Sequence, residues 1–408
     1  MNCPVLWCVI YLSRDCHGFV RTPSAPNSTT APAGNDNPLT FTRRSPDTFS
    51  LYSSDAYSMS SYAKHRGERR WSTIALSVSI GLATIHLAGA QNVPLISGGA
   101  GLITSTNGGI TTYLPIIAPA LVAPLGNHLL VESRASIVES YFPRGGGQSG
   151  YTHDAFLGLS YLQADVIPNR NLTFVAGEFL TPFGTYNERL SPIWISNFEQ
   201  TPMIFSLGTM STASSVGGML RGSAFSSDKV NLDYAAYFSV ASTNQQFDAE
   251  RSTGGRASVY MPNARLEAGV SFGRLLQNTR ENYFGTHLWW EPDNSNFRLR
   301  SEYARGPHAQ GYWVEADYRC LRFHSEDSLI GRFEPALRVQ QTFRALPDSE
   351  DGLPAANTQR IDFALDYHLP REVRINTSYT RQLSSTGNRN IWQTGVVYRF
   401  LIPTWRGK

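Results

Sequence analysis

The residues from 391 to 400 read Ile-Trp-Gln-Thr-Gly-Val-Val-Tyr-Arg-Phe, and every second one can face an apolar medium. The apolar-facing set consists of Trp392, Thr394, Val396, Tyr398 and Phe400. The alternate positions, from Gln393 to Arg399, are mixed and carry the charge. Because the side chains of a strand alternate between two faces, this segment predicts a strand with one apolar face and one hydrated face. Aromatic residues at both ends of the apolar face are typical of strands that cross a bilayer.

The same segment follows the order polar, any, Gly, any, any, aromatic, any, aromatic, carried by Gln393, Gly395, Tyr398 and Phe400. This order resembles the C-terminal assembly signal of bacterial outer-membrane barrels, and the resemblance implies the barrel-assembly machinery as a partner. The signal normally ends the protein, whereas here residues 401–408 follow it as a short tail.

The region 59–90 predicts a secretory signal peptide. A basic cluster from Lys64 to Arg70 precedes a largely apolar run at 74–87, and Ala88-Gly89-Ala90 supplies small residues for cleavage before Gln91. The alternative, a transmembrane helix, is disfavoured because the apolar run is shorter than the roughly 20 residues that a span needs. Residues 1–58 are rich in Ser, Thr, Pro and Asn, and Met59 would be a natural start. We interpret 1–58 as a non-native extension or a disordered tail.

Charge and cysteine content exclude several classes of protein. The first 90 residues hold eight of the 35 basic and five of the 32 acidic residues, so the rest of the chain has 27 of each. A balanced chain gives no argument for nucleic-acid binding. Of the four cysteines only Cys320 lies beyond the leader, which excludes an internal disulfide or a cysteine-based metal site in the exported chain.

Beyond the signal peptide, no apolar run is long enough for a spanning helix, while short alternating segments recur. We expect strands at 129–141, 154–166, 171–180, 215–226, 230–240, 254–261, 265–275, 281–291, 296–305, 311–320, 334–345, 358–368, 372–382 and 391–400. Only helices and closed barrels satisfy every backbone group in lipid. The sequence therefore predicts an all-β, transmembrane antiparallel barrel of about 14–16 strands over 128–400. Residues 91–127 are expected to form an irregular lead-in that plugs or lines the barrel mouth, with an extra strand as the alternative. A missed hairpin at 320–333 or 181–214 would raise the count to sixteen.

The longest connection runs from about 181 to 214 and is unusually apolar and aromatic. Long loops in compact folds are usually functional. We expect it to fold into the lumen, with Tyr186, Glu188 and Arg189 near a pore constriction. The alternative is a packed loop that caps the rim.

Three stretches, Gly177 to Gly184, Gly311 to Arg319 and Phe333 to Arg338, resemble the phosphate-selective porin O and P family. The resemblance covers roughly 150–400, and it implies a sixteen-stranded, trimeric outer-membrane barrel that passes anions. The chain departs from the family in its cations, because only Lys229 and Lys408 remain beyond the leader.

Charged residues on the hydrated faces are expected to line the lumen. They are Arg134, Arg221, Arg298, Arg300, Arg319, Arg338, Arg344, Arg360, Arg374, Arg399, Glu315, Asp317, Asp362 and Asp366. Arginine binds phosphate and carboxylate through its planar fork, so an excess of arginines would favour anions. Cross-strand ion pairs that brace a hydrated wall are the simpler interpretation of most of them.

We expect a bacterial outer-membrane porin through which small hydrophilic solutes diffuse passively, with a weak preference for anions. Its surroundings are expected to be lipid. We expect no cofactor, no metal and no enzymatic activity. Two alternatives stay open. One is a barrel enzyme acting on lipid, although the scattered histidines and the lack of a Gly-x-Ser-x-Gly or His-Glu-x-x-His motif count against it. The other is a soluble secreted β-sandwich that binds a ligand.

Overall fold

The computed structural model describes residues 94–144, 149–190, 192–209, 214–241, 251–277, 280–293, 295–322, 328–346 and 352–403. The expected signal peptide at 59–90, the expected extension at 1–58 and residues 404–408 of the expected tail lie outside these ranges. Residues 401–403 of that tail instead belong to the last strand.

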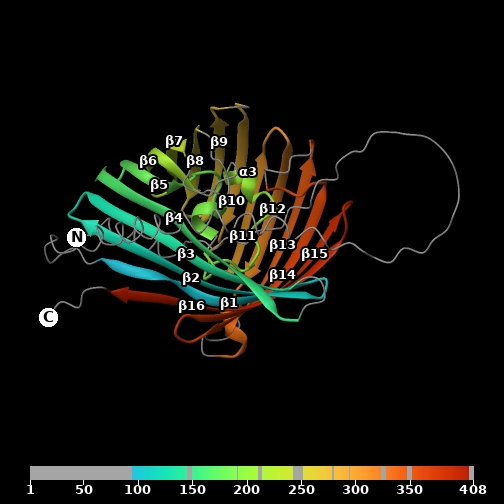
Figure 1. Ribbon diagram of the computed structural model, residues 1–408. Helices are drawn as coiled ribbons and strands as arrows, with labels where there is room; N and C mark the ends of the chain where they lie inside the picture. Colours follow the sequence, from blue (N-terminus) through green and yellow to red (C-terminus); the bar gives the residue numbers. More distant parts are fainter. Residues whose placement is uncertain are drawn as a thin grey trace, which may run out of the picture.

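The described residues form a closed antiparallel β-barrel in which neighbours in sequence are neighbours in the sheet (Figure 1). The strands are β1 (Leu95–Asn107), β2 (Ile110–Leu125), β3 (Leu129–Pro143), β4 (Tyr151–Asn169), β5 (Leu172–Leu180), β6 (Ser214–Ser226), β7 (Asn231–Ala241), β8 (Ser252–Met261), β9 (Leu266–Leu275), β10 (Asn282–Trp290), β11 (Phe297–Arg305), β12 (Ala309–Tyr318), β13 (Phe333–Arg344), β14 (Thr358–Leu369), β15 (Val373–Ser384) and β16 (Arg389–Pro403). The predicted barrel class is confirmed, and the strand count is the upper of the two expected.

Strand β1 closes the barrel by pairing with β16 on one side and β2 on the other. Ala100 lies opposite Tyr398 of β16 and opposite Ile117 of β2. A closed ladder leaves no free strand edge, which is the condition for placing strands in lipid. The predicted assembly segment thus lies in the strand that seals the ring.

The prediction of an irregular lead-in at 91–127 is wrong, because β1 and β2 supply the missing hairpin there. The expected hairpin at 320–333 or 181–214 is not found among the described residues of those links. Three prolines in β2 suggested a break, since each removes one backbone donor from the ladder. The segment also lacks alternation, because its inner face is apolar as well: Ile116 and Ile103 are buried inside the barrel.

Alternation of buried and exposed side chains shows which face of each strand lies inside. In β14, Arg360, Asp362 and Asp366 are buried, whereas Ile361 and Phe363 are exposed. In β16, Trp392, Val396 and Tyr398 are exposed. The two predicted faces are therefore present, with charge inside and apolar or aromatic side chains outside.

Helical structure is limited to short turns in the described residues: η1 (Tyr186–Leu190), α3 (Phe205–Thr209), η2 (Cys320–Arg322) and η3 (Ile330–Arg332). No helix in these ranges has the length and apolar character needed to cross a membrane. Both η2 and η3 belong to the link between β12 and β13.

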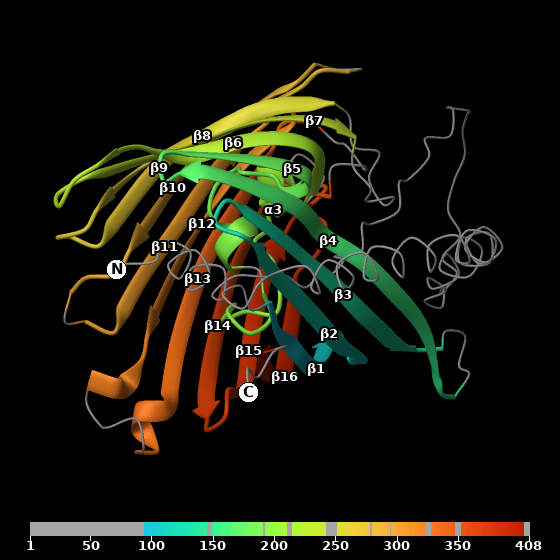
Figure 2. The ribbon, with the colours of Figure 1, turned by 90° about the vertical axis from the view of Figure 1, so that its left-hand side faces the viewer.

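The connection between β5 and β6 lies inside the barrel and carries η1 and α3 (Figure 2). We call it the infolded segment; it is described over 181–190 and 192–209. Its groups contact the inner faces of strands from β8 round to β1, as the next section shows. The predicted infolding is confirmed, and the alternative of a rim-capping loop is not what the structure shows.

Candidate functional site

The infolded segment begins with an anchor on β11. The carboxylate of Glu302 accepts hydrogen bonds from the backbone N–H groups of Thr185 and Tyr186, the second at 2.6 Å, and from the Thr185 hydroxyl at 2.9 Å. The backbone N–H of Gly184 donates to the Ser271 hydroxyl of β9 at 3.0 Å. Gly184 has φ +64°, and a Cβ there would meet the Glu302 carboxylate at 2.6 Å, which explains why glycine occupies this turn.

Tyr186 packs between the segment and the wall. Its ring makes edge contacts with Trp313 at 5.9 Å and with Phe205 at 5.8 Å between ring centroids. Only 4% of Tyr186 is exposed, and burial raises the pKa of its hydroxyl to about 12, with the Arg338 charge acting against that rise. Tyr186 therefore anchors the segment on the wall, and its proposed place near the constriction stays a prediction.

Glu188 and Arg189 follow in the π-helical turn η1, and each is paired with the wall. Glu188 lies 2.5 Å from Arg256 of β8. Arg189 binds Glu267 of β9 through both terminal nitrogens, at 2.6 and 3.1 Å. Both residues are partly exposed, so their proposed place beside the constriction stays a prediction.

The tip of the segment is apolar and rests on the wall near the barrel seam. Ile193 belongs to a buried cluster with Ile103, Ile116 and Val397, and Trp194 packs against that cluster. A Cβ on Gly99 of β1 would come within 2.3 Å of the Trp194 ring. The apolar inner face of β1 and β2 is therefore the seat of this tip.

The segment then returns along the strands that carry most of the predicted lumen charges. The backbone N–H of Met203 donates to the side-chain oxygen of Gln340 on β13 at 2.8 Å. Arginines of β13, β14 and β15 donate to carbonyl oxygens of residues 193–201. The segment is thus held along both limbs and at its tip.

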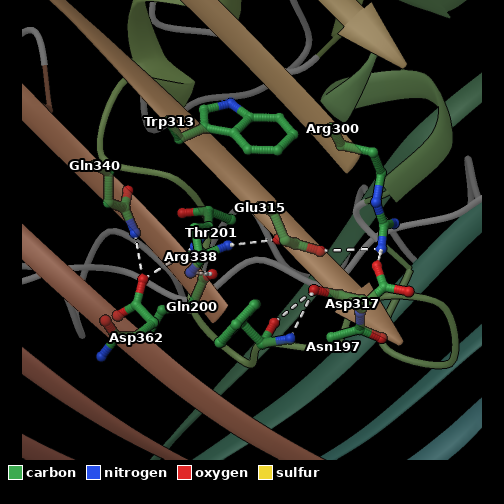
Figure 3. A network of polar contacts seen from close by, with 12 residues as sticks. Asn197, Gln200, Thr201, Arg300, Trp313, Glu315, Asp317, Arg338, Gln340 and Asp362 are labelled. Atoms are coloured by element: carbon green, nitrogen blue, oxygen red, sulfur yellow. Dashed lines mark hydrogen bonds and ion pairs between the residues drawn. The ribbon is translucent and has the colours of Figure 1, made fainter. Parts of the chain in front are cut away.

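A row of alternating charges crosses four strands behind the returning limb (Figure 3). Arg300 of β11 lies 3.1 Å from Glu315 of β12, and Glu315 lies 3.8 Å from Arg338 of β13. Arg338 lies 3.0 Å from Asp362 of β14. Asp317 adds a second carboxylate to Arg300. Each of these residues is at most 3% exposed, which leaves little of this row open to a passing solute.

The structure places the other predicted lumen residues as follows. Arg360 pairs with Asp362 and Arg374 with Asp366, all buried. The partly exposed Arg221 pairs with Asp165 two strands away, and Arg298 pairs with Asp317 and Glu334. Arg344 and Arg399 lie near strand ends. Arg319 lies beyond the last residue of β12, so it is a link residue and not a strand residue as expected.

Arg134 of β3 differs from these paired arginines. It is 1% exposed, and its three guanidinium nitrogens have no hydrogen-bond partner among the described residues. Its charge lies over the ring of Tyr161, 4.8 Å from the ring centre. No carboxylate among the described residues is hydrogen-bonded to the Arg134 guanidinium.

Several contributing residues could not be singled out from the sequence. Glu302, Gln340 and Asn376 bind the infolded segment, and Trp194 seats its tip. Strand alternation puts the first three on the inner face, but no sequence signal says which inner residues meet the segment. Among the described residues, no group of three or more His, Cys, Asp or Glu is placed to hold a metal ion.

Comparison with known proteins gives similarity of fold only. No family model matches the chain, and no curated protein matches it. Solved structures that are similar include OmpT of Vibrio cholerae lacking loop L8 (9% identity, TM-score 0.49, covering 76% of this chain and 99% of that one). They also include the anion-selective porin from Comamonas acidovorans (11%, 0.47, 76% and 100%) and OccK7 of Pseudomonas aeruginosa (11%, 0.41, 77% and 100%). The resemblance to the phosphate-selective family stays a prediction.

Proposed function

We propose that this protein is a channel of the bacterial outer membrane through which small hydrophilic solutes diffuse passively. The observation that carries the proposal is the inverted distribution of side chains around a closed barrel. Charged residues such as Arg338 and Asp362 are fully buried inside, while Phe363 and Trp392 are 53% and 59% exposed on the outside. A water-soluble β-sandwich would bury the apolar face and expose the charges.

The energetic reason is that lipid accepts apolar side chains but not charges. An arginine or lysine on the lipid face near mid-membrane costs about 2–4 kcal/mol, whereas an inner face can hold charges that water or counter-charges compensate. The exposed apolar side chains recur on strands around the ring, from Leu102 of β1 to Val396 of β16. This belt supports lipid as the surrounding medium of the barrel, and the β16 segment supports the barrel-assembly machinery as its partner.

The proposal is tested by conductance in planar lipid bilayers. Protein refolded in detergent should migrate faster on a gel before boiling than after, and should then give stepwise currents on insertion. A boiled sample of the same preparation is the control. A folded, heat-modifiable barrel that never conducts would overturn the channel, and a preparation that stays monodisperse in buffer without surfactant would overturn the membrane barrel.

For selectivity, we propose a weak preference for anions that depends on Arg134. Most of the predicted arginines are neutralised by carboxylates in the wall, so they add little field for a solute. Arg134 has no such partner among the described residues. Arg134 is as buried as the paired row, so it acts on a solute through its uncompensated field and not by contact. One uncompensated cation in the wall biases selectivity towards anions.

Reversal potentials in a potassium chloride gradient test this preference. Arg134→Gln should move the reversal potential towards the cation side. The matched control is Arg265→Gln, which removes an arginine from the exposed turn between β8 and β9. A wild-type cation preference, or an equal shift in both variants, would contradict the proposal. Added phosphate should reduce chloride current if the family resemblance extends to phosphate, and a trimer on native gels would extend it to assembly.

A further inference from the structure

Hydrogen bonds from wall arginines reach the returning limb of the infolded segment at its backbone carbonyl oxygens. Nη2 of Arg374 donates to the carbonyl oxygens of Ile193 at 2.6 Å and Ser196 at 2.7 Å. These two carbonyls flank the tip that packs against Gly99. One guanidinium therefore fixes both the approach to the tip and the departure from it.

Three further carbonyls are bound in the same way. Nη2 of Arg338 donates to Gln200 at 2.7 Å, and Nη2 of Arg360 donates to Thr201 at 2.8 Å. The Asn376 amide donates to the Asn197 carbonyl at 2.7 Å. Strands β13, β14 and β15 each contribute at least one of these donors. Figure 3 shows Gln200 and Thr201 beside Arg338.

Two polar side-chain atoms of the same loop are left without partners in the described part of the chain. The Nδ2 atom of Asn197 and the Oε1 atom of Gln200 are buried without a hydrogen-bond partner among the described residues. Leaving a buried polar group unsatisfied costs free energy. The polar contacts of the wall with this stretch are therefore made mainly to its carbonyl oxygens.

Carboxylates on the wall fix the three arginines from behind. Asp362 lies between Arg338 and Arg360, 3.0 and 3.2 Å from their Nε atoms. Asp366 lies 3.1 Å from Nη1 of Arg374. With one edge on a carboxylate and another on a carbonyl, these guanidinium groups have little capacity left for a passing anion. They are 0–7% exposed.

We propose that Arg338, Arg360 and Arg374 are positioning residues that clamp the infolded segment by its carbonyl oxygens and thereby fix the free cross-section of the barrel. They are not an anion-binding ladder. Only the effect on the free cross-section rests on the proposed channel function. The clamp itself is a statement about the segment and can be measured without any current.

Arg374 is the site for the main test, because charge and geometry can be separated there. Arg374→Gln removes both, whereas Arg374→Lys keeps the charge but replaces the planar fork with a shorter-reaching ammonium whose three donors leave one nitrogen and do not reproduce the spacing of the fork. The matched control is Arg298, which pairs with Asp317 and Glu334 and contacts no described residue of the infolded segment in any hydrogen bond or ion pair found. Arg298→Gln and Arg298→Lys repeat the two changes away from the clamp.

The readout is amide hydrogen exchange of peptides from 192–209 in detergent-folded protein, together with open-channel current noise. Both Arg374 variants should lose exchange protection in this segment and gain noise, while both Arg298 variants keep wild-type values. If Arg374→Lys keeps wild-type protection while Arg374→Gln loses it, charge alone suffices and the clamp is refuted. Unchanged protection in both variants also refutes it.

Two further variants protect the test against misfolding and confirm the mechanism. If Arg374→Gln gives no heat-modifiable band, the double variant Arg374→Gln with Asp366→Asn removes the stranded carboxylate and carries the test instead. Gly99→Leu leaves every charge in place but drives a side chain into Trp194, so it should reproduce the loss of protection at the tip. If wild-type protein folds but never conducts, the channel proposal fails while the exchange result still decides the clamp.

Discussion

Glu302 offers a direct measure of how firmly the first limb of the infolded segment is attached. Its carboxylate accepts hydrogen bonds from the backbone N–H groups of Thr185 and Tyr186, from the Thr185 hydroxyl, and from the Trp313 indole at 3.3 Å. Glu302→Leu leaves the two backbone donors and the Thr185 hydroxyl of the segment without their acceptor, whereas the Trp313 indole belongs to the wall and does not count towards the attachment. At a lower bound of about 1 kcal/mol for each of these three donors, the attachment weakens by about 3 kcal/mol.

This loss predicts a specific change in hydrogen exchange. If the amides of Thr185 and Tyr186 exchange through local release of the segment, about 3 kcal/mol corresponds to roughly a hundredfold fall in protection. Glu302→Gln keeps one carbonyl oxygen in the same place and should lose less. Peptides from β13 to β15 serve as the internal control, because they do not bind this limb through Glu302.

Two results would refute the reasoning about Glu302. Unchanged exchange at 185–186 in Glu302→Leu would mean that the carboxylate does not hold the segment. An equal acceleration in β13 to β15 would mean that the substitution loosens the whole barrel and not the attachment. Near-neutral effects in both variants would place the holding force in the ring contacts of Tyr186 instead.

Two further predictions test the membrane face and the lumen charge. Phe363→Arg, on the exposed face of β14, should lower the free energy of unfolding in lipid vesicles by about 2–4 kcal/mol, measured by urea titration against Phe363→Leu; no loss would contradict a lipid-facing side. Burial raises the pKa of Glu199, in the infolded segment, from 4.5 to about 7, with Arg374 acting against the rise. Because the folded state holds the proton more tightly, Glu199 makes the free energy of unfolding fall as pH rises from about 4.5 to about 7. Deprotonation also adds a negative charge to the lumen, so anion preference should decline between pH 6 and 8; an equal decline in Glu199→Gln would contradict this assignment.

The sequence predicts the barrel wherever the two faces of a strand differ in polarity. In β14, alternating Asp and apolar residues put Asp362 and Asp366 inside and Phe363 outside, as found. In β1 and β2 the rule fails, because the inner face is also apolar and receives Ile193 and Trp194 from far along the chain. An inner surface that packs against protein and not water carries no polar signature, so periodicity alone could not have found that hairpin.

The candidate site, too, could be predicted from the sequence only in part. Alternation predicts that Arg338 points inward, but its partners depend on register, which sets Glu315 and Asp362 directly opposite it on the two neighbouring strands. Local sequence does not specify that register, because it is fixed by the whole closed ladder. The carbonyl of Gln200 as a third partner is still less predictable, since every residue has a carbonyl and none is marked in the sequence.

Register also explains why a wall so rich in arginine is expected to be only weakly selective. Arg300, Glu315, Arg338 and Asp362 are consecutive partners across β11, β12, β13 and β14, so the signs alternate across these four strands. Alternating charges at contact distance cancel each other's field within a few ångströms, and a solute beyond that distance meets little net potential. Selectivity must then come from charges outside the row, of which Arg134 is the clearest among the described residues. The number of arginines facing the lumen is therefore a poor guide to ion preference, and the pairing of each one across the strands is the quantity that decides it.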